Sequence, residues 1–423
     1  MTQRPAVSLW DSSADEADIV SPLAGDGQTD LAIVGAGFTG LSTALHAAEA
    51  GIDCHVIEAR HVGFGGSGRN VGLVNAGLWL PPQDVRARMG EAQGAALIDL
   101  LGKAPDVVYS LIEKHQIRCE ATRNGTIHAA HSPRGQADLA RRAGEWARLG
   151  APVALLDRAE VAEKTGTEAF FGGLLDRRAG TVNPMGYARG LARAARAAGA
   201  RISTGARVTG LHREGGQWRV RTASGTLSAR DVVLGTNAYS DDLWPGLRRS
   251  YTMIHFFQLA TPPMGEAGAH ILKDGQGLWD TAPIMFALRR DDAGRLIVGS
   301  MGALMGGTGG LSRRWAARRL RRLFPELGPV EFESGWHGQI AMTPDHLPRI
   351  HRLAEGLYAP IGYNGRGIAP GTVFGRALAG LIAGAGEAGL PMPISDLTPV
   401  PARTLRTGFY HTAFAVNQLI RGL

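Results

Sequence analysis

Cysteine is almost absent from this chain, because its 423 residues contain only Cys54 and Cys119. Two thiols cannot form a disulfide framework or a cysteine-based metal site, so no metal is expected and a reducing cytoplasm is the predicted location. A long apolar segment is also missing: no run of 18 uninterrupted apolar residues occurs, and no membrane span is expected. The first 21 residues carry four acidic side chains and no apolar h-region, which is unlike a signal peptide.

Lysine is scarce as well, and the net charge of +7 comes almost entirely from arginine. The densest basic run, residues 313–322, has apolar residues at near-helical spacing, so it is interpreted as the solvated face of an amphipathic helix. No nucleic-acid motif accompanies it, and no nucleic-acid partner is predicted. An apolar content of 44% and a length of 423 residues indicate a globular protein of two domains.

A glycine-rich turn near the N-terminus is the first motif with chemical content. Leu31–Val34 predicts a strand, and Gly35-x-Gly37-x-x-Gly40 leads from it into a helix from about Phe38 to Ala50. The glycines permit a tight turn, a close approach of a pyrophosphate to the backbone, and close packing of helix on strand. The helix N-terminus offers free N–H groups to phosphates.

Glu58 ends the next predicted strand, 54–58, where its carboxylate suits the ribose hydroxyls of an adenine nucleotide. A carboxylate would repel a 2′-phosphate, so the sequence favours FAD or NAD over NADP.

Two further segments are rich in glycine. One, 63–72, contains Ser67, Arg69 and Asn70, and is interpreted as backbone wrapped around a ligand. The other, 361–368, precedes a predicted helix from about Pro370 to Ala383 and offers a second helix N-terminus.

The rest of the pattern alternates helices and strands. Helices are expected at 95–101, 105–115, 134–149 and 185–198, with a hairpin across 117–130 around Arg123-Asn-Gly125. Strands are expected at 201–208, 218–222, 226–229, 231–234, 251–261, 284–290, 295–299, 332–342 and 356–360.

Four motifs in this order resemble the FAD-dependent D-amino-acid oxidase superfamily: the glycine turn with Glu58, Ser67-Gly-Arg-Asn70, Leu234-Gly-Thr-Asn-Ala-Tyr239, and Trp336 followed by Gly362-Tyr-Asn-Gly-x-Gly367. The γ-glutamylputrescine oxidoreductase-like branch is the most similar. The resemblance implies a mixed α/β fold, with a Rossmann-like FAD-binding domain and a substrate domain built on a large antiparallel sheet. The expected boundaries are an N-terminal arm (1–29), an FAD-binding domain (30–81, 150–244, 336–390), a substrate domain (82–149, 245–335) and a C-terminal segment (391–423).

The resemblance also assigns cofactor contacts to positions of this chain. It implies that the glycine turn holds the pyrophosphate, that Glu58 and Arg60 hold the adenosine, and that the backbone of Val208 meets the adenine. Gly365 to Ile368 would direct N–H groups at the flavin, favouring its reduced form. The full expected cofactor set is Gly35, Gly37, Phe38, Thr39, Gly40, Glu58, Ala59, Arg60, Gly66, Ser67, Arg69, Asn70, Gly72, Leu73, Val208, Thr236, Gly365, Arg366, Gly367 and Ile368.

The chain departs from the family pattern at three places. His337 stands where relatives that bind an amino-acid carboxylate have arginine, which argues against a simple α-amino acid as substrate. Ile297 stands where sarcosine-oxidase-like relatives have a lysine for oxygen activation. The residues that attach flavin covalently in other relatives are missing, so FAD is expected to be non-covalent.

The predicted reaction is oxidation of the C–N bond of a small amine or N-substituted amino acid, by hydride transfer to flavin N5 and hydrolysis of the imine, with O2, a quinone or another electron acceptor. The alternatives are a flavin-dependent hydroxylase, or a flavin-binding subunit of a larger dehydrogenase complex.

Candidate substrate-site residues lie on the predicted substrate-domain strands. Tyr251 and His255 are four residues apart on one of these strands, so they share a face. The candidates are Tyr251, His255, Arg289 and His337.

Overall fold

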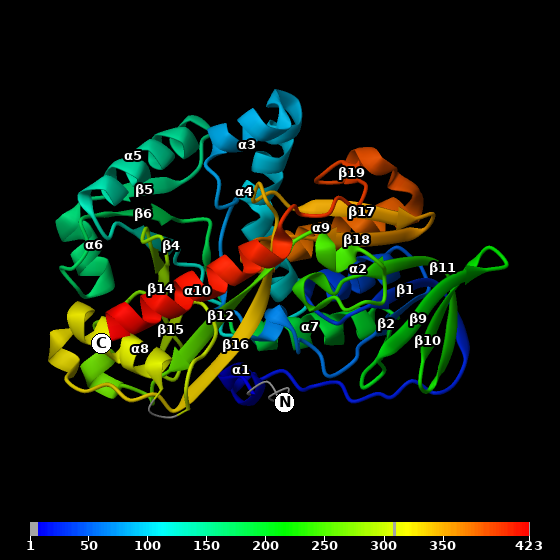
Figure 1. Cartoon of the computed structure of the whole chain (residues 1–423), viewed down its shortest axis with the longest axis horizontal. Coiled ribbons are helices and arrows are strands. Elements are labelled where there is room, and N and C mark those ends of the chain that lie inside the picture. The colour runs from blue at the N-terminus through cyan, green and yellow to red at the C-terminus, as the bar shows by residue number, and fades with distance from the viewer. Residues whose placement is uncertain (1–6, 308–309, 423) are drawn as a thin grey trace.

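The computed structural model describes residues 7–307 and 310–422, which form two lobes side by side, each built around one large sheet (Figure 1). The mixed α/β class expected from the sequence is confirmed. Helices α3 (Pro82–Met89) and α4 (Glu91–Lys114) stand between the lobes at the top of that view.

The first lobe contains a nine-stranded sheet whose centre is parallel, in the order β18-β11-β1-β2-β8. The buried strand β1 pairs with β11 on one side and β2 on the other, so it lies in the middle of the sheet. Helices α2 (Phe38–Glu49), α7 (Pro184–Ala197) and α9 (Ile368–Gly380) pack against one another beside this sheet. The strands are β1 (Gly27–Val34), β2 (Cys54–Ile57), β8 (Arg201–Ser203), β9 (Val208–Glu214), β10 (Gln217–Thr222), β11 (Gly225–Leu234), β17 (Arg349–Ala354), β18 (Leu357–Ile361) and β19 (Ile394–Ser395).

The second lobe contains an eight-stranded sheet in which every pair of neighbours is antiparallel except β13 and β4. Helices α5 (Pro133–Arg148), α6 (Arg158–Thr165) and α8 (Leu311–Leu323) belong to this lobe, and α10 (Arg403–Gly422) crosses its outside (Figure 1). The strands are β4 (Thr126–Ala129), β5 (Val153–Leu156), β6 (Gly173–Asp176), β12 (Thr252–Ala260), β13 (Gly277–Asp280), β14 (Phe286–Arg290), β15 (Leu296–Met301) and β16 (Ser334–Met342).

Sheet membership divides the chain differently from the expected boundaries at two places. Strands β5 and β6 lie within 150–244, yet they extend the second sheet, and so does β16, most of which lies within 336–390. A short antiparallel ribbon of β3 (Leu73–Val74) and β7 (Gly180–Thr181) joins the segments 30–81 and 150–244 outside both large sheets. The chain therefore crosses between the lobes more often than the motifs alone indicate.

Several local predictions are wrong, because distant partners outcompete local signals. No hairpin forms across 117–130: β4 pairs with β6 and β13, while Thr122 bridges to Thr181. A single helix, α4, replaces the two expected, and Pro105 lies inside it. The chain turns at Gly205, where φ is +66°, so β8 and β9 are separate strands, whereas β11 is one strand where two were expected.

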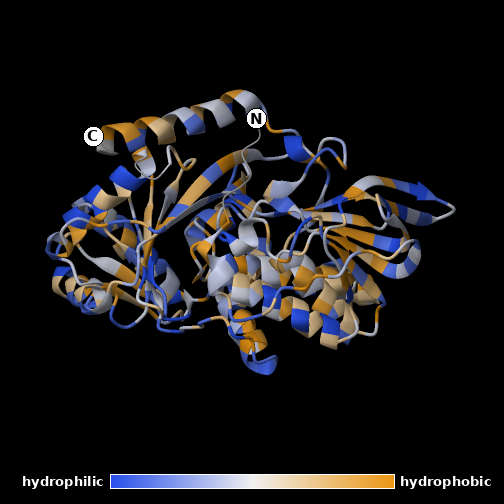
Figure 2. Ribbon diagram, turned by 90° about the horizontal axis from the view of Figure 1, so that it is seen from below, coloured by the Kyte–Doolittle hydropathy of each residue, from blue (hydrophilic) through white to orange (hydrophobic). Residues whose placement is uncertain are grey.

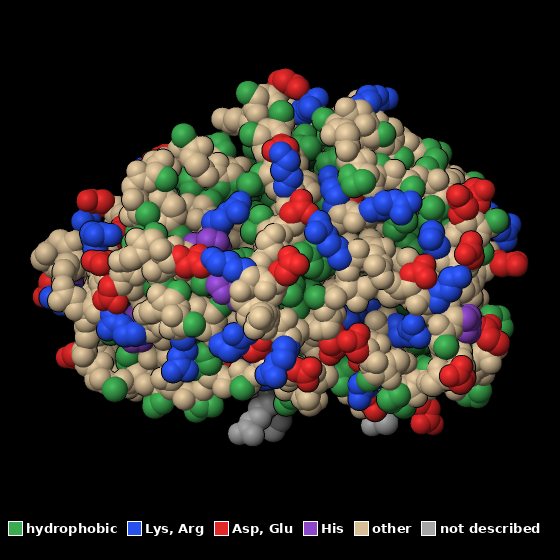
Figure 3. All heavy atoms as spheres, turned by 180° about the vertical axis from the view of Figure 1, so that it is seen from behind, with side chains coloured by type: hydrophobic (Ala, Val, Ile, Leu, Met, Phe, Trp, Pro, Cys, Tyr) green, Lys and Arg blue, Asp and Glu red, His purple; other side chains and the backbone are tan. Residues whose placement is uncertain are grey.

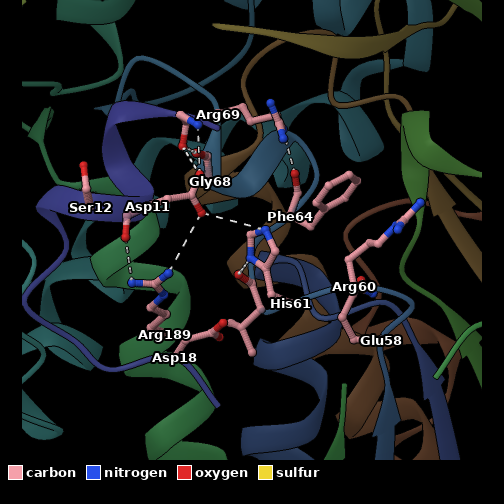
Figure 4. Close-up of polar contacts among 12 residues, drawn as sticks. Asp11, Ser12, Asp18, Glu58, Arg60, His61, Phe64, Gly68, Arg69 and Arg189 are labelled. Carbon is pink, nitrogen blue, oxygen red and sulfur yellow. Dashed lines mark hydrogen bonds and ion pairs between the residues drawn. The ribbon is translucent and has the colours of Figure 1, made fainter. Parts of the chain in front are cut away.

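The N-terminal arm is also more than a polar extension. Within it α1 (Leu9–Ser13) buries Trp10 completely, and the indole Nε1 donates to the carbonyl of Asn70 at 2.9 Å. The hydroxyl of Ser8 donates to the carbonyl of Gly68 at 2.9 Å. The arm therefore braces the glycine-rich loop 63–72 (Figure 4). Residues 1–6 of the expected arm lie outside the described residues.

The tightest approach between strand and helix is at Gly40, where an added Cβ would lie 2.0 Å from the carbonyl oxygen of Gly35. We expect Gly40→Ala to lower the free energy of unfolding by about 2 kcal/mol or more, because the backbone on both sides must separate. Thermal unfolding of the purified protein measures this change.

The matched control is another helical glycine, Gly144 in α5, where an added Cβ would have its nearest neighbour at 3.9 Å. Gly144→Ala should raise the stability by about 0.5–1 kcal/mol, because alanine has the higher helix propensity. Equal effects at the two positions would contradict the close-packing role of Gly40.

Candidate active site

One cavity of about 800 Å³ runs between the lobes. One end is lined by the glycine turn and the end of β2, and the other by the inner face of the second sheet. Between these ends lie the loop 64–71 and the turn before α9. An elongated cavity of this kind can hold a dinucleotide along one part and a small substrate at the end.

The glycine turn predicted to bind a pyrophosphate lines one end of the cavity. Gly35 has φ +103°, a conformation that favours glycine, and Gly37 is the N-cap of α2. An added Cβ on Gly37 would lie 2.9 Å from the hydroxyl oxygen of Ser67. That hydroxyl accepts a hydrogen bond from the Phe38 N–H at 3.0 Å, so the loop is fixed directly over the helix N-terminus. Thr39, Ala59, Gly66 and Thr236 also line the cavity.

The carboxylate of Glu58 is buried at the end of β2 beside Arg60 (Figure 4). Its two oxygens accept from the N–H groups of Ala36 and Arg60, both at 2.8 Å. Burial raises the pKa of Glu58, and the two backbone hydrogen bonds oppose that shift. The carboxylate therefore fixes the turn, while its remaining lone pairs face the cavity where a ribose would lie. Val208, the first residue of β9, lines the same end.

The loop 66–72 is held by its own side chains. Asn70 donates from Nδ2 to the carbonyls of Gly66 and Ser67 and accepts from the Gly72 N–H at 2.8 Å. Arg69 is buried outside the cavity wall, donates from Nε to the Phe64 carbonyl at 2.8 Å, and lies 5.1 Å from the Phe64 ring (Figure 4). Asn70 and Leu73 line the cavity, whereas Arg69 and Gly72 lie behind it.

The turn before α9 faces the loop across the cavity. Asn364 has φ +53°, its Oδ1 accepts from the Thr343 N–H at 2.8 Å, and its carbonyl accepts from Nε1 of Trp79 at 2.6 Å. Gly365, Gly367 and Ile368 line the cavity at the N-terminus of α9. Arg366 does not: its guanidinium lies between the rings of Trp79 (4.6 Å) and Trp279 (5.2 Å) and donates to the Ala76 carbonyl at 2.9 Å. Burial, with repulsion from Arg142, lowers the pKa of Arg366 to about 9.

The far end of the cavity is the inner face of the second sheet, and residues on this wall were not predicted from the sequence. Phe256 and Gln258 of β12, Ala287 of β14, and Ser300 and Met301 of β15 line it, with His128 and Trp279 closing one side. The imidazole of His128 stacks on the Trp279 ring at 4.8 Å. Burial, together with repulsion from Arg142 and Arg366, lowers the pKa of His128 to about 3, so this ring is neutral at physiological pH.

Two buried polar atoms of this wall have no hydrogen-bond partner: Nε1 of Trp279 and Oε1 of Gln258. Both residues are at least 95% buried. Because an unsatisfied buried donor or acceptor is costly, the pair is suited to a ligand that offers both an acceptor and a donor.

None of the four candidate substrate residues lines the cavity. On β12 the even-numbered Phe256 and Gln258 face it, so His255 lies on the opposite side, where its Nδ1 is 3.3 Å from Nε2 of His411. The His337 ring lies 6.1 Å from the His255 ring on that same side. Alternate residues of β12 share a face, and the face that carries His255 points away from the cavity.

The two remaining candidates are buried. Tyr251 is in the core just before β12. Arg289 shares the face of Ala287 but lies deeper, where its Nη1 donates to the Val182 carbonyl and its Nη2 is 3.9 Å from Oε2 of Glu120. The cavity is lined at this end by Trp79, His128, Gln258 and Trp279 instead of the four candidates. The sequence did contain a signal for Gln258 and Trp279. Each is a residue with a polar group among mainly apolar neighbours of a strand, and such a group is expected to have a polar partner.

Comparison with known proteins gives the same assignment as the geometry. A family model described as FAD dependent oxidoreductase (DAO) matches residues 30–381. The chain is 30% identical to the γ-glutamylputrescine oxidoreductase of Escherichia coli, over 90% of each chain, and 30% identical to a probable oxidoreductase, OrdL, of Haemophilus influenzae, over 86% of this chain and 85% of that one. The crystal structure of glycine oxidase from Geobacillus kaustophilus superposes with a TM-score of 0.69 at 21% identity, covering 84% of this chain and 94% of that one.

The chain belongs to the FAD-dependent oxidoreductase family. The resemblance stated from the motifs is confirmed, and so is FAD as the cofactor. The residues present fit it: the glycine turn admits a close backbone approach, α2 and α9 direct their N-termini at the cavity, and Glu58 faces its adenosine end.

The basic run, the surface charges and one long apolar helix can each be compared with what the sequence predicts. The basic run forms α8, whose Trp315, Leu320 and Leu323 are buried, as the amphipathic reading predicts. Cations and anions are interspersed on the face in Figure 3. One segment, Ile368–Ala385, is long and apolar enough to cross a membrane by length and composition, but 56% of it is buried against the rest of the protein, which is typical of a core helix.

We predict that acid or heat releases FAD from the yellow protein into solution, because neither cysteine is near the cavity: Cys54 and Cys119 are both buried outside its wall. Gly37→Val should give colourless protein, since its side chain would collide with the Ser67 hydroxyl and fill the space above the helix N-terminus. Absorbance of the supernatant and the pellet after denaturation measures both. Colour that stays with the precipitate would contradict a non-covalent cofactor, and stoichiometric FAD in Gly37→Val would contradict the pyrophosphate site.

Proposed function

We propose that this flavoenzyme oxidises the C–N bond of an amine carried on a longer chain, such as an acylated diamine or another N-substituted amine. The observation that carries the proposal is the wall at the substrate end of the cavity. It combines two unpartnered polar atoms, a neutral histidine and a majority of aromatic and aliphatic side chains.

The charges at this end argue against a small α-amino acid. Of the described residues that line it, the charged ones are Asp138, Arg142 and Asp280. Arg142 Nε donates to Asp138 at 2.8 Å, and Asp280 accepts from Arg319 at 2.7 Å. Each charge already has a partner, so a substrate carboxylate would compete for a guanidinium instead of finding a free one.

The unpartnered atoms favour an amide group in the substrate. An amide carbonyl can accept from Nε1 of Trp279, and an amide N–H can donate to Oε1 of Gln258. A site of this kind discriminates strongly against analogues that lack the group, because they leave buried polar atoms unpaired. The relative from Escherichia coli, 30% identical over 90% of the chain, acts by its name on γ-glutamylputrescine, which is an acylated diamine.

The residues of this chain perform three tasks in the proposed reaction. Phe256, Ala287 and Met301 form an apolar surface that confines the substrate and excludes water. His128 is neutral above about pH 3, so it places no positive charge beside the amine and favours its unprotonated form. FAD, when bound, accepts the hydride. The N-terminus of α9 directs backbone N–H groups at the cavity, where they favour negative charge.

We predict that N-acylated diamines bleach the flavin under anaerobic conditions, while glycine and D-alanine do so poorly. Trp279→Phe should lower kcat/KM for an N-acyl diamine about tenfold, because it removes the indole N–H and keeps most of the ring. The same substitution should change kcat/KM for the unacylated diamine much less. Single-turnover reduction measured by absorbance gives these rates.

His337→Arg is the matched control, since His337 lies on the far side of β16, beside His255. It should leave the order of substrate preference unchanged. Rapid bleaching by D-alanine, or an equal loss with both diamines in Trp279→Phe, would contradict the proposed substrate class.

We further infer that oxygen is a slow electron acceptor compared with a quinone or dye. Ile297 lies in an apolar cluster with Trp10 and Trp336 and brings no charge to the cavity. Arg366, the expected substitute, lies behind Trp79 and Trp279, and burial weakens its preference for the charged form. Among the described residues of this wall Arg142 is a cation, but it is paired with Asp138, so an unpaired positive charge that would stabilise superoxide is lacking there.

Stopped-flow reoxidation of the reduced enzyme tests this inference. Met301→Lys, on the cavity side of β15, should speed the reaction with oxygen on the order of tenfold, because a nearby charge has to supply only about 1.4 kcal/mol for that gain. Met253→Lys, on β12 outside the cavity wall, should not. Fast oxygen reaction in the unmodified enzyme would contradict the inference.

Turnover by the purified chain with a dye as electron acceptor would exclude a dependence on other subunits. We propose the cytoplasm as the location of the protein.

A further inference from the structure

The C-terminal helix α10 packs one face against the second lobe and leaves apolar side chains exposed on the opposite face. Gln418 accepts from the Ser312 hydroxyl at 2.7 Å, Phe414 is buried against Gly302, and His411 contacts His255. These three residues recur at i, i+3 and i+7, so they mark one face of the helix. Arg403 adds a hydrogen bond from Nε to the Tyr251 carbonyl at 2.9 Å. The helix is therefore attached to the second lobe in a fixed orientation.

The opposite face carries a stripe of large apolar side chains in solvent. Leu405, Phe409, Val416 and Ile420 are spaced by four, seven and four residues, with Leu419 beside them, and their exposed fractions are 75%, 70%, 44%, 69% and 47% respectively. These five are half of the exposed large apolar side chains in the described part of the chain. In Figure 2 the helix lies along the outer edge of the molecule. Large apolar side chains that gather in one exposed stripe, unlike single scattered ones, indicate a binding surface.

The charge of α10 indicates what covers this stripe. The helix contains three arginines and no acidic residue. Arg406 is exposed about 100° around the helix from Leu405, at the margin of the stripe. The exposed Arg249 lies next to the start of the helix, because its carbonyl accepts from the Val400 N–H at 2.7 Å. Apolar residues on one face with arginine at the margin are the pattern of a helix that lies on an anionic membrane surface.

A second copy of the chain fits the same face less well. A 20-residue helix is about 30 Å long and about 10 Å wide, so one face offers roughly 300 Å² per partner, against about 800 Å² in a stable interface. Two copies of α10 would also bring arginines together with no carboxylate on either helix to pair with them. A lipid surface requires neither a large complementary area nor specific partners.

We propose that α10 is a peripheral membrane-docking helix that places its stripe of Leu405, Phe409, Val416, Leu419 and Ile420 into the headgroup region of anionic lipid. The helix lies beyond residues 30–381, the segment matched by the family, so this surface is separate from the FAD site and from the proposed substrate. Binding should require both anionic lipid and the stripe, and should weaken at high salt.

The test is sedimentation of the FAD-loaded full chain with vesicles, either half phosphatidylglycerol and half phosphatidylcholine, or phosphatidylcholine alone. We expect binding to the first and not to the second. The double variant Phe409→Ser/Ile420→Ser should bind at least about tenfold more weakly, and Arg406→Glu should also weaken binding. The matched controls are Leu155→Ser, an exposed leucine of β5, and Arg196→Glu, an exposed arginine of α7, and both should bind like the unmodified chain.

A fluorescent label gives an independent readout, because both native cysteines are buried. Leu405→Cys carrying an environment-sensitive dye should shift to the blue on anionic vesicles, while a dye at Val20→Cys, also exposed but beside β8, should not. Retained FAD and unchanged anaerobic reduction by an amine show that the variants are folded.

Three outcomes would overturn the proposal. The first is that the unmodified chain does not sediment with anionic vesicles, and the second is that the stripe variant sediments as well as the unmodified chain. The third is a dimer in solution that Phe409→Ser dissociates without any vesicle binding, which would assign the stripe to a second copy of the chain.

Discussion

The active site depends on how closely one helix approaches one strand. Gly40 lies against the Gly35 carbonyl with no room for a Cβ, and this contact sets the position of the α2 N-terminus at the end of β1. Ser67 then fixes the next loop to that N-terminus through the Phe38 N–H, and Glu58 fixes the turn through Ala36. A change of one methyl group at Gly40 would displace all of these groups, because the packed interior transmits the shift instead of absorbing it.

The second sheet contributes chemistry through its register. In β12 the residues that face the cavity alternate with residues that face α8 and α10, so Gln258 and Phe256 meet the site while Phe257 packs on Trp315 and His255 meets His411. A slip of one residue in β12 would place His255 in the cavity and remove the amide of Gln258. The nine-residue pairing of β12 with β16 holds this register from Thr252 to Ala260.

The sequence predicted the nucleotide end of the site well and the substrate end poorly, for a physical reason. The glycine turn and Glu58 act through backbone geometry within 30 residues, so their spacing alone carries the information. The proposed substrate wall combines β4, β12, β13, β14 and β15, and the face of β12 that points inward is set by packing against α8 and α10. Helix α10 was not predicted, so nothing in the sequence reading told the two faces of β12 apart.

Arg289 illustrates how a charged residue in a strand can serve the site without entering it. Its guanidinium donates to the Val182 carbonyl, lies 5.3 Å from the Trp10 ring and is 3.9 Å from Glu120. Gly72, with φ +85°, fits between this guanidinium and Val182, where any Cβ would collide with both. Burial lowers the pKa of Arg289, and Glu120 opposes that shift. Because a buried charge is tolerated only with its partners in place, Arg289 couples the N-terminal helix, the loop ending at Gly72 and the second sheet into one arrangement. Arg289, a candidate for substrate binding in the sequence, therefore holds together backbone segments that support the cavity.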